Sequence, residues 1–449
     1  MNYNILVIGK GGREHAMAWK FSQSSCIKNT FVCPGNAGTA IEDNISNVDI
    51  PLDDLEAIIK FVKMNDIHLT VIGPEDPLVN GIANRFHQEG LKIFGPKKEF
   101  AQLEGSKVFS KDFMDKYNIS TPRYKNFSSK TNAIEYIKEQ SFPIVVKADG
   151  LAAGKGVIIA SDYEEAKNAV DKLFDLTYSN NVVIEEFVTG QELSAIYVCN
   201  FGGCSNEIAL PWTKDYKSRD EFNSGPNTGG MGAVSHPLCY EHKNFIFKLH
   251  IDIEVILIQT ITAINTIYKT IEPGYLGFLY IGLMIDKNNN LKVLEYNCRL
   301  GDPETQNLML QLNNKNIDLL DLILNKSGTE IKTKDLNLEN MQEENPHYCC
   351  TIVLAAQGYP EKPELGFFLD TSAIIESDKI KIFHAGTSLT NGKIQVTGGR
   401  ILTINVYSDT KSSAIDIAYE NIKKIIAYED EQFNQKNQNL VFYREDIGN

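Results

Sequence analysis

The sequence predicts a multidomain chain in which a doubly wound parallel α/β domain precedes two α+β units. Strand and helix patterns alternate over residues 1–103, which is typical of a parallel sheet covered on both faces. Further along, a glycine-rich loop joins two strand patterns, within Pro143–Gly156 and just after it. The end of the chain combines several strand patterns with one helix, as in an antiparallel sheet covered by a helix. A length of 449 residues fits about two to three domains.

Composition indicates a soluble globular protein. Hydrophobic residues make up 43% of the chain and charged residues 23%, which is ordinary for that class. The net charge of −14 argues against nucleic acid as a partner, because phosphate backbones are held by clustered Lys and Arg. A negatively charged substrate must therefore meet a local group of positive side chains.

Several features predict a cytoplasmic protein without a membrane segment. None of the eight cysteines has C-x-x-C spacing, and Cys349 and Cys350 are adjacent, so we expect reduced thiols in the core. The start, MNYNILVIG, has no basic segment and leads directly into a strand pattern, unlike a signal peptide. Charged and amide residues interrupt the apolar run Ile251–Ile267, which predicts a core helix and not a membrane span.

The first domain is predicted from short apolar runs that alternate with helical spacing. Its ligand should lie beyond the carboxyl ends of the strands, where GKGGRE, CPGNAGT and GPEDP occur. A cap at Asp53 or Asp54 is expected for the second helix. The expected strands are Asn4–Gly9, Thr30–Cys33, Leu69–Glu75 and Leu91–Pro96, and the expected helices are Glu14–Ser22, Asp53–Asn65 and Val79–Gln88.

The motif GKGGREH could belong to a nicotinamide dinucleotide site or to a phosphate site. A nicotinamide-dependent dehydrogenase would need glycine where Glu14 stands and an acidic residue at the end of the second strand, which closes in Val32-Cys33-Pro34. A phosphate at the amino terminus of the first helix, helped by Arg13, needs neither. We favour the phosphate.

The glycine-rich loop predicts a phosphate site. Ile144–Val146 is a β-branched run typical of a buried strand. Lys147 ends that run, and Gly150, Gly154, Lys155 and Gly156 follow. Glycines let backbone N–H groups surround an anion, and the lysines add charge. A flexible linker is the alternative, but Gly150–Gly156 contains no Ser, Pro or acidic residue. A Walker loop would lead into a helix, whereas a strand pattern follows here.

Two further stretches of the central region allow alternatives. Gly105–Tyr117 predicts a helix capped by Ser106; Lys107 in its first turn opposes the helix dipole, so it is either a ligand contact or an ordinary surface lysine. Val182–Ser194 predicts two strands with a turn. Its carboxylates could be general acid/base groups or could frame a nucleotide hinge, and we favour the hinge.

The long polar stretch Leu210–Pro237 shows no hydrophobic period and is predicted to be a functional loop. Asp215, Lys217 and Arg219 beside NTGGMG favour a loop that closes over substrate. A long helix is expected at about 236–269.

A hairpin pattern over Gly277–Asn297 predicts a metal site. Strand alternation sends Glu295 and Asn297 to one face, and carboxylate and amide oxygens suit Mg²⁺. A solvated strand face is the alternative for so short a pattern. Arg299, Asp302 and Glu304 follow at once, which favours the metal site.

The last unit, about 332–449, predicts strands in HYCCTIVLAA, KIFHAGTSL and GGRILTINVYS and a helix at Ser412–Ala427. No catalytic constellation is apparent there, and His384 is interpreted as a structural histidine.

Eleven motifs in order resemble the glycinamide ribonucleotide synthetase (phosphoribosylamine–glycine ligase) family of the ATP-grasp superfamily. The resemblance covers nearly the whole chain. Other ATP-grasp purine ligases share the architecture but not GGREHA, PGNAGT and GPNTGGMG together. The motifs are VIGKGGREHAMAWK, PGNAGTA, IGPEDPLVNG, LKIFGP, QLEGSK, VVKADGLAAGKGV, GPNTGGMGA, GFLYIGLMID, EYNCRLGDPETQ, FHAGT and GGR.

The resemblance implies an amino-terminal domain at 1–103, an ATP-grasp domain at 104–326 with a mobile lid at about 123–190, and a carboxy-terminal domain at 332–449. It also implies a cytoplasmic monomer of purine biosynthesis that joins glycine to 5-phosphoribosylamine with ATP and Mg²⁺ or Mn²⁺. No nucleic acid or membrane takes part.

The resemblance further implies a role for each matching residue. ATP would be held by Lys107, Lys147, Gly150, Gly154, Lys155, Gly156, Glu185, Glu186, Val188 and Glu192, and the metal by Glu295 and Asn297. Glycine and its acyl phosphate would meet the catalytic residues Arg299, Asp302, Asp215 and Lys217. Substrate-binding residues would be Gly11, Gly12, Arg13, Asn36, Gly38, Glu75, Asn227, Gly229 and Gly230.

Two departures from the family pattern stand out. The usual D-H-K-R becomes Asp215-Tyr216-Lys217-Ser218-Arg219, so a tyrosine replaces the histidine and the arginine moves one place. A second metal carboxylate is not evident, and Asp286 is the residue we consider for it.

Overall fold

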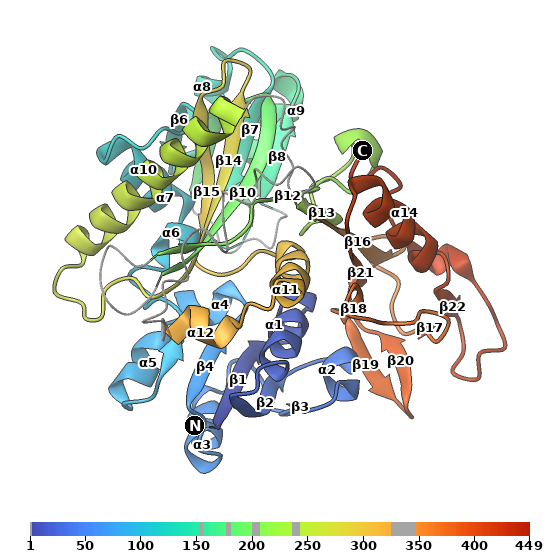
Figure 1. The fold of residues 1–449 in the computed structure, drawn as a ribbon. Helices are drawn as coiled ribbons and strands as arrows, with labels where there is room; N and C mark the ends of the chain where they lie inside the picture. The colour runs from blue at the N-terminus through green and yellow to red at the C-terminus, as the bar shows by residue number, and fades with distance from the viewer. Residues whose placement is uncertain (1, 152–155, 177–180, 200–206, 236–242, 325–346) are drawn as a thin grey trace.

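The computed structural model describes residues 2–151, 156–176, 181–199, 207–235, 243–324 and 347–449. Figure 1 shows the first domain at the bottom in blue, the central strands above it, and the carboxy-terminal unit at the right in orange and red. Within the described residues the strands form four sheets. The predicted mixture of a parallel α/β domain with antiparallel α+β units is confirmed.

The first domain is a parallel sheet with strand order β3-β2-β1-β4-β5. Its core strand β1 buries Ile5–Ile8 completely. Asp54 caps α3, as one of the two predicted candidates. The helix predicted at Val79–Gln88 is instead two helices, because Gly81 takes a left-handed conformation between them (φ +89°). The elements are β1 Tyr3–Gly9, α1 Gly12–Ser22, β2 Ile27–Pro34, α2 Ala37–Ile41, β3 Ile45–Asn47, α3 Leu55–Met64, β4 Leu69–Ile72, α4 Glu75–Val79, α5 Ile82–Gln88 and β5 Ile93–Phe94.

A small antiparallel sheet, which we call the lid sheet, has strand order β6-β9-β7-β8. Here β7 and β8 pair across the glycine-rich loop, which confirms the predicted strand, loop and strand. Helices α8 and α9 pack on this sheet. The elements of this region are α6 Gln102–Gly105, α7 Lys107–Lys116, β6 Tyr124–Phe127, α8 Lys130–Ile137, β7 Ile144–Ala148, β8 Val157–Ala160, α9 Tyr163–Phe174 and β9 Val182–Glu186.

A ten-stranded sheet, the central sheet, runs from the middle of the molecule into the carboxy-terminal unit, because β13 pairs with β16. The two strands predicted in Val182–Ser194 belong to different sheets, so their connection joins the lid sheet to the central sheet. The predicted loop Leu210–Pro237 contains two short strands, β12 and β13, that its polar composition concealed. The elements are β10 Gly190–Cys199, β11 Ile208–Ala209, β12 Thr213–Asp215, η1 Glu221–Asn223, β13 Gly232–Ser235, α10 Lys243–Ile267, β14 Gly277–Asp286, β15 Leu291–Asn297, α11 Glu304–Asn314 and α12 Leu319–Leu324.

The carboxy-terminal unit adds strands to the central sheet and forms a second small sheet, β19-β20-β17-β22. The strand predicted in KIFHAGTSL is divided between these two sheets, at Ala385–Gly386. The predicted helix Ser412–Ala427 ends at Ile422, and Ile426–Tyr428 pairs with β17 instead. The elements are β16 Tyr348–Ala356, β17 Phe368–Asp370, β18 Ile380–His384, β19 Thr387–Thr390, β20 Lys393–Val396, β21 Arg400–Ser408, α14 Lys411–Ile422, β22 Ile426–Tyr428, η3 Gln438–Leu440 and β23 Val441–Phe442.

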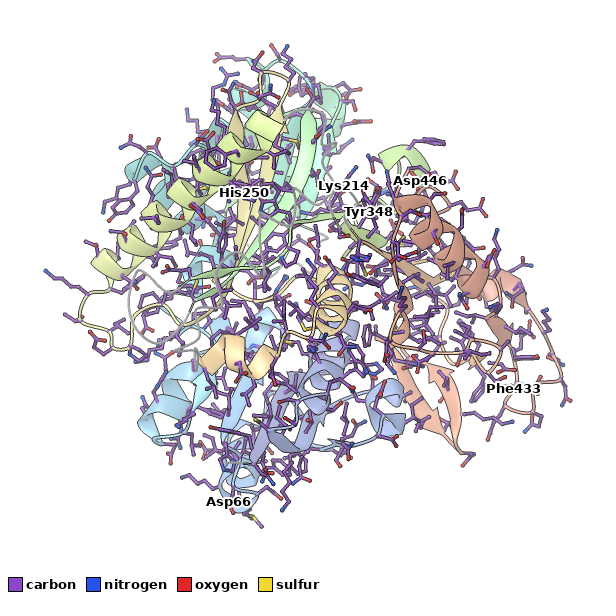
Figure 2. The ribbon with its side chains drawn as sticks, viewed as in Figure 1. Asp66, Lys214, His250, Tyr348, Phe433 and Asp446 are labelled. Atoms are coloured by element: carbon purple, nitrogen blue, oxygen red, sulfur yellow. The ribbon has the colours of Figure 1, made fainter. Side chains whose placement is uncertain are left out.

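Apolar side chains fill the spaces between these layers (Figure 2). Helix α10 buries Ile253 and Ile264 against the central sheet, while Phe247 and Ile258 on its other face are exposed. The predicted core helix is therefore buried on one face only. Among the described helices, none is both long and apolar enough to span a membrane.

Candidate active site

A cleft of about 820 Å³ lies where the first domain, the lid sheet and the central sheet meet. Residues far apart in the sequence reach it from every part of the chain. Its lining includes Arg13 and Glu75 from the first domain, Lys147 and Glu185 from the lid sheet, Glu295 from the central sheet and Arg400 from the carboxy-terminal unit. A ligand bound here would contact all of these parts together.

The lid wall of the cleft places two lysines around one carboxylate. Lys147 Nζ lies 2.9 Å from Glu185 Oε1, and Lys111 Nζ lies 3.1 Å from Glu185 Oε2. All three side chains are buried. Burial lowers the pKa of Lys111 to about 8, although Glu185 opposes that change. Two ammonium groups beside one carboxylate leave a positive site that suits phosphate.

Lys107 reaches the base of the glycine-rich loop, where its Nζ donates to the Gly150 carbonyl oxygen at 2.8 Å. Gly150 has a φ of +94°, a conformation that favours glycine. The Gly156 carbonyl accepts a hydrogen bond from the Ala148 N–H at 2.8 Å and closes the base of the loop. Gly154 and Lys155 lie outside the described residues.

The connection between the lid and central sheets also lines the cleft, through Glu186, Val188 and Glu192. Burial would raise the pKa of Glu186, but hydrogen bonds from Lys292 and Arg123 outweigh it and lower the pKa to about 2. A carboxylate held ionised in this way is unsuited to general acid catalysis. This supports the interpretation of the segment as a nucleotide hinge.

Glu295 and Asn297 both face the cleft from β15. Tyr296 between them points the other way, into the core, where its hydroxyl is 2.7 Å from Thr260 Oγ1. The pKa of Glu295 is lowered to about 2, chiefly by Lys217, whose Nζ lies 3.0 Å away. An ionised carboxylate beside an amide oxygen fits Mg²⁺ or Mn²⁺, with further ligands from water and phosphate.

Asp286, the other carboxylate considered for a metal, lies away from the cleft. It sits in the turn between β14 and β15, where its Oδ1 accepts the N–H groups of Asn288 and Asn290. Its carboxylate organises that turn, so the structure gives no support to a metal role for it.

Arg299, which follows β15, contacts one carboxylate of the first domain and one of helix α6. Its Nε lies 3.1 Å from Glu75 Oε2, and its Nη2 lies 2.9 Å from Glu104 Oε1. Burial would raise the pKa of Glu75, but Arg299 and Arg13 lower it to about 2. Burial instead dominates at Glu104 and raises its pKa to about 7.

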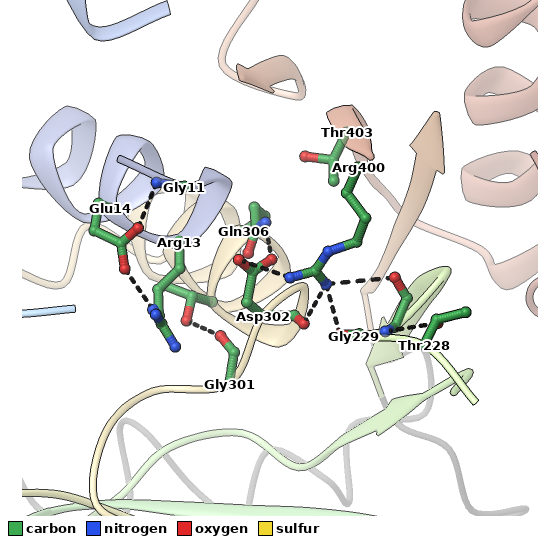
Figure 3. A network of polar contacts seen from close by, with 12 residues as sticks. Gly11, Arg13, Glu14, Thr228, Gly229, Gly301, Asp302, Gln306, Arg400 and Thr403 are labelled. Atoms are coloured by element: carbon green, nitrogen blue, oxygen red, sulfur yellow. Dashed lines mark hydrogen bonds and ion pairs between the residues drawn. The ribbon is translucent and has the colours of Figure 1, made fainter. Parts of the chain in front are cut away.

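An arginine from the carboxy-terminal unit holds two of the predicted site segments together (Figure 3). Arg400 Nη1 donates to the carbonyl oxygens of Gly229 and Asp302, each at 2.6 Å, and Nη2 lies 3.1 Å from Asp302 Oδ2. The Gly229 N–H donates to the Tyr359 hydroxyl at 3.0 Å. Although no catalytic constellation was expected in this unit, two of its residues line the cleft.

Asp215 and Glu304 bring two buried carboxylates to the cleft wall. Burial raises the pKa of Asp215 well above its ordinary value, and Glu304 adds to the rise. Ser194 Oγ donates to Glu304 Oε1 at 3.2 Å and lies 2.9 Å from the Tyr280 hydroxyl.

Several residues predicted to bind substrate in the first domain are occupied within the protein. Glu14 Oε2 accepts the Gly11 N–H at 2.6 Å, so this backbone donor at the start of α1 is already satisfied within the protein. Asn36 Nδ2 donates to the His384 carbonyl oxygen at 2.7 Å, and Asn36 Oδ1 accepts the Thr39 N–H.

Packing explains one glycine of these motifs. A Cβ on Gly38 would lie 2.3 Å from His15 Cε1 and 2.7 Å from His384 Cβ, whereas one on Gly12 would meet only the end of the Gln306 side chain, at 2.5 Å from Nε2. His384 is buried, and its pKa is lowered to about 3, mainly by burial. Its backbone N–H donates to His15 Nδ1 at 2.8 Å, which is consistent with the structural role predicted for it.

Lys111, Glu104, Tyr359 and Arg400 are among the cleft residues that were not predicted as site residues from the sequence. Lys111 follows Lys107 by four positions on one helix, a spacing that puts both on the same side. This spacing could have identified Lys111 as a site residue from the sequence. The other three reach the cleft through contacts between distant segments.

Models of one family match the chain in three consecutive parts. They are described as phosphoribosylglycinamide synthetase N domain at residues 3–104, ATP-grasp (A) domain at 105–305 and C domain at 349–449. The phosphoribosylamine–glycine ligase of Vibrio vulnificus is 40% identical over 453 residues, covering 99% of this chain and 97% of the relative.

Two solved structures have a similar fold. The crystal structure of a phosphoribosylamine–glycine ligase from Thermotoga maritima superposes with a TM-score of 0.73 at 34% identity and covers 99% of this chain and 100% of its own. The biotin carboxylase domain of a Hydrogenobacter thermophilus 2-oxoglutarate carboxylase, solved with MgADP, has a TM-score of 0.71. It is 15% identical and covers 95% of this chain and 91% of its own. That likeness concerns the fold alone.

Proposed function

The chain belongs to the phosphoribosylglycinamide synthetase family, and we propose that its cleft joins glycine to 5-phosphoribosylamine with ATP, in purine biosynthesis. Glycinamide ribonucleotide, ADP and phosphate are the products. The observation that carries the proposal is the composition of the cleft. Lys147 and Glu295 line the same cavity as Arg13 and Glu75 of the first domain, so a nucleotide and a phosphoribosyl substrate can meet there.

The phosphate side of the reaction belongs to the lid wall. Lys107, Lys111 and Lys147 neutralise the ATP phosphates, while the connection at residues 186–192 holds adenine and ribose. Glu295 and Asn297 hold Mg²⁺ or Mn²⁺, which supplies positive charge to the transferred phosphoryl group when bound. Gly154 and Lys155 remain proposed phosphate contacts from the family resemblance.

The acyl side of the reaction lies between the lid wall and the first domain. Glycine places its carboxylate toward Arg299 and Lys217, where phosphorylation gives glycyl phosphate. The amine of phosphoribosylamine, held by Arg13 and Glu75, then attacks the acyl carbon and phosphate leaves. Asp302, Asn227 and Gly229–Gly230 form the wall between the two substrates, and closure of residues 213–232 excludes water from the mixed anhydride. Catalysis therefore depends mainly on positioning and on charge.

Glycine-dependent ADP release tests the reaction. Purified enzyme with Mg²⁺-ATP and 5-phosphoribosylamine should release ADP with glycine and not with other carboxylates, and should make no AMP. Activity with a different carboxylate or phosphoribosyl acceptor would instead indicate another ATP-grasp purine ligase. Nucleotide binding without turnover would indicate a non-catalytic module.

Isotope transfer tests the intermediate. Glycine labelled with ¹⁸O in its carboxylate should deliver label to inorganic phosphate during turnover, because the phosphorylated oxygen leaves with phosphate. Unlabelled phosphate with full product formation, or label in AMP, would contradict the acyl phosphate route.

We also propose that the enzyme acts as a cytoplasmic monomer. The acidic composition and the absence of C-x-x-C spacing support the location. Light scattering of the purified protein at assay concentration would measure the oligomeric state, and a mass twice the chain's 50.3 kDa would contradict the monomer.

A further inference from the structure

The loop that the sequence predicts to close over substrate forms a small hairpin, which we call the substrate hairpin (residues 216–232). Ser218 and Asn227 pair across it in an antiparallel bridge, and the Thr228 N–H donates to the Lys217 carbonyl oxygen at 2.8 Å. All four of these residues line the cleft. The position of the hairpin therefore sets the shape of this cleft wall.

Arg444 holds the substrate hairpin from a distant part of the chain. Its Nη1 donates to the Ser218 carbonyl oxygen at 3.0 Å, across 226 positions. Asn223 Oδ1 accepts from the same guanidinium, at 3.5 Å from Nη1 and 3.4 Å from Nη2. The arginine is 2% exposed, and its Nε and Nη2 form a two-point ion pair with Asp446, at 2.7 Å and 2.6 Å. A planar guanidinium with five donors can hold several acceptors in one fixed geometry.

Asp446 extends this contact to the tip of the hairpin. Its Oδ2 accepts the Phe222 N–H at 2.8 Å. Phe222 is 85% exposed and has a φ of +55°, an unfavourable conformation that surrounding contacts must hold. Burial would raise the pKa of Asp446, but hydrogen bonds from Arg444 and from the Phe222 N–H outweigh it and lower the pKa. The ion pair therefore stays formed near neutral pH.

Tyr216 stands where the family pattern usually has histidine, and it belongs to the same set of contacts. Its hydroxyl accepts the Gly448 N–H at 3.0 Å. The guanidinium carbon of Arg444 lies 5.2 Å from the centre of its ring, and Lys214 Nζ lies 4.7 Å from that centre. An aromatic ring attracts cations, whereas a protonated histidine beside them would be repelled. Tyrosine therefore suits these cationic surroundings.

The segment that carries Arg444 is itself fixed in the core of the carboxy-terminal unit. The Tyr419 hydroxyl donates to the Arg444 carbonyl oxygen and accepts the Ile447 N–H, each at 2.9 Å. Ile447 is fully buried and belongs to the same apolar cluster as Ile422 of α14. The substrate hairpin is therefore tied to a packed core and not to another surface loop.

We propose that Arg444 is a positioning residue that fixes the substrate hairpin at the cleft, so that glycyl phosphate reacts with the amine and not with water. The inference rests on the proposed function, in which this part of the chain shields the mixed anhydride. Arg444 is absent from the described residues that line the cleft, and it acts through Ser218 and Asn223, which do line it.

The reaction that Arg444 suppresses is hydrolysis of the intermediate. The oxygen of water bonds to the acyl carbon, and the bond from that carbon to the phosphate oxygen breaks. Phosphate leaves with the oxygen that it took from glycine, and a proton from water passes to the solvent. A hairpin held in one place excludes the water that this step needs.

The test measures ADP and glycinamide ribonucleotide in the same reaction of the full-length enzyme. The wild type should form them in equal amounts. In Arg444→Ala, the rate of ADP release that yields no product should rise about ten- to hundredfold, as expected for the loss of a charge-assisted hydrogen bond. In H₂¹⁸O, the glycine recovered from this variant should gain label, because water attacks the acyl carbon. The KM for ATP should stay at its wild-type value, since the lid wall is untouched.

Two matched controls separate positioning from stability and from charge. Ile422→Val removes one methyl group from the core of the same unit, so it lowers the melting temperature but removes none of the polar contacts to the hairpin. Lys423→Ala removes one positive charge from an exposed position of that unit. Both controls should form ADP and product in equal amounts.

A second variant decides if thermal unfolding shows that Arg444→Ala is not folded. The Asp446 side chain is 17% exposed, so Asp446→Ala is better tolerated, and it releases the Phe222 N–H at the hairpin tip. It should raise ADP release without product about tenfold.

Three outcomes would overturn the inference. The first is equal formation of ADP and product in the folded variants, and the second is the same excess of ADP in Ile422→Val. The third is label from water in phosphate and not in glycine, which would mean that water attacks phosphorus. Wild-type enzyme without glycine-dependent ADP release would instead refute the proposed function, which is a separate result.

Discussion

The two walls of the cleft use their motif residues differently. On the lid wall, Lys147 and Glu185 face the cavity directly. On the first-domain wall, Asn36 and Gly38 are taken up by contacts with the carboxy-terminal unit, through His384. Only Arg13 and Glu75 of the predicted first-domain residues line the cavity among the described residues. A motif therefore identifies a loop at a site, and the packing decides which of its members meet a ligand.

The largest effect should come from Glu295→Gln, in the central-sheet part of the cleft. The amide keeps the shape and loses the charge, so the Mg²⁺ half-saturation should rise on the order of a hundredfold, the upper end for damage to a metal site. A Mg²⁺ titration of ADP release measures it. Asp286→Asn, at the other end of the same hairpin, is the control and should leave the titration unchanged. The reverse pattern would place the metal elsewhere.

The second-largest effect is expected for Lys147→Ala. Removing one charge-assisted phosphate contact costs about 1.5–3 kcal/mol, a roughly ten- to hundredfold loss in kcat/KM for ATP. Steady-state kinetics at varied ATP measure it, with Lys138→Ala as an exposed lysine control in the same region. Turnover near that of the wild type would count against a phosphate role for this wall.

Lys147 and Glu295 could be predicted from the sequence, whereas Arg400 could not, and the reason is physical. Lys147 and Glu295 each lie near the end of a strand whose pattern is local, so the alternation of side chains already places them. Arg400 reaches Gly229 across 171 positions of the chain, and no local pattern encodes that contact.

Local patterns also failed to give the bounds of some predicted elements. The helix after Thr410 ends five residues early because Ile426–Tyr428 pairs with β17, a tertiary contact that overrides helical spacing. The strands in Leu210–Pro237 are three or four residues long at Thr213–Asp215 and Gly232–Ser235, too short to show a period.

A smaller and more selective effect is expected for Arg13→Ala. The side chain lines the cleft but is shared, since Nε donates to Glu14 Oε1 and Nη1 to the Leu300 carbonyl oxygen. We expect about a tenfold rise in the KM for phosphoribosylamine, with the constants for ATP and glycine little changed. Arg85→Ala, on the outer surface of the same domain, is the control. An equal rise in the KM for all three substrates would mean that the two walls do not bind different substrates.

The smallest effect on substrate binding is expected for Asn36→Ala, and it tests the comparison most directly. Asn36 caps α2 and donates to carbonyl oxygens of Lys10 and His384. Its loss removes a cap, worth about 0.5–2 kcal/mol, and leaves buried carbonyls without a donor. The free energy of unfolding should therefore fall by about 1–3 kcal/mol, while the KM for phosphoribosylamine changes less than about twofold at a temperature where the variant is folded. Denaturant unfolding and substrate titration on the same preparation measure both quantities. If the KM instead rises tenfold with stability unchanged, Asn36 contacts the substrate itself, and the first-domain motif acts as a binding motif in the same direct way as the lid wall.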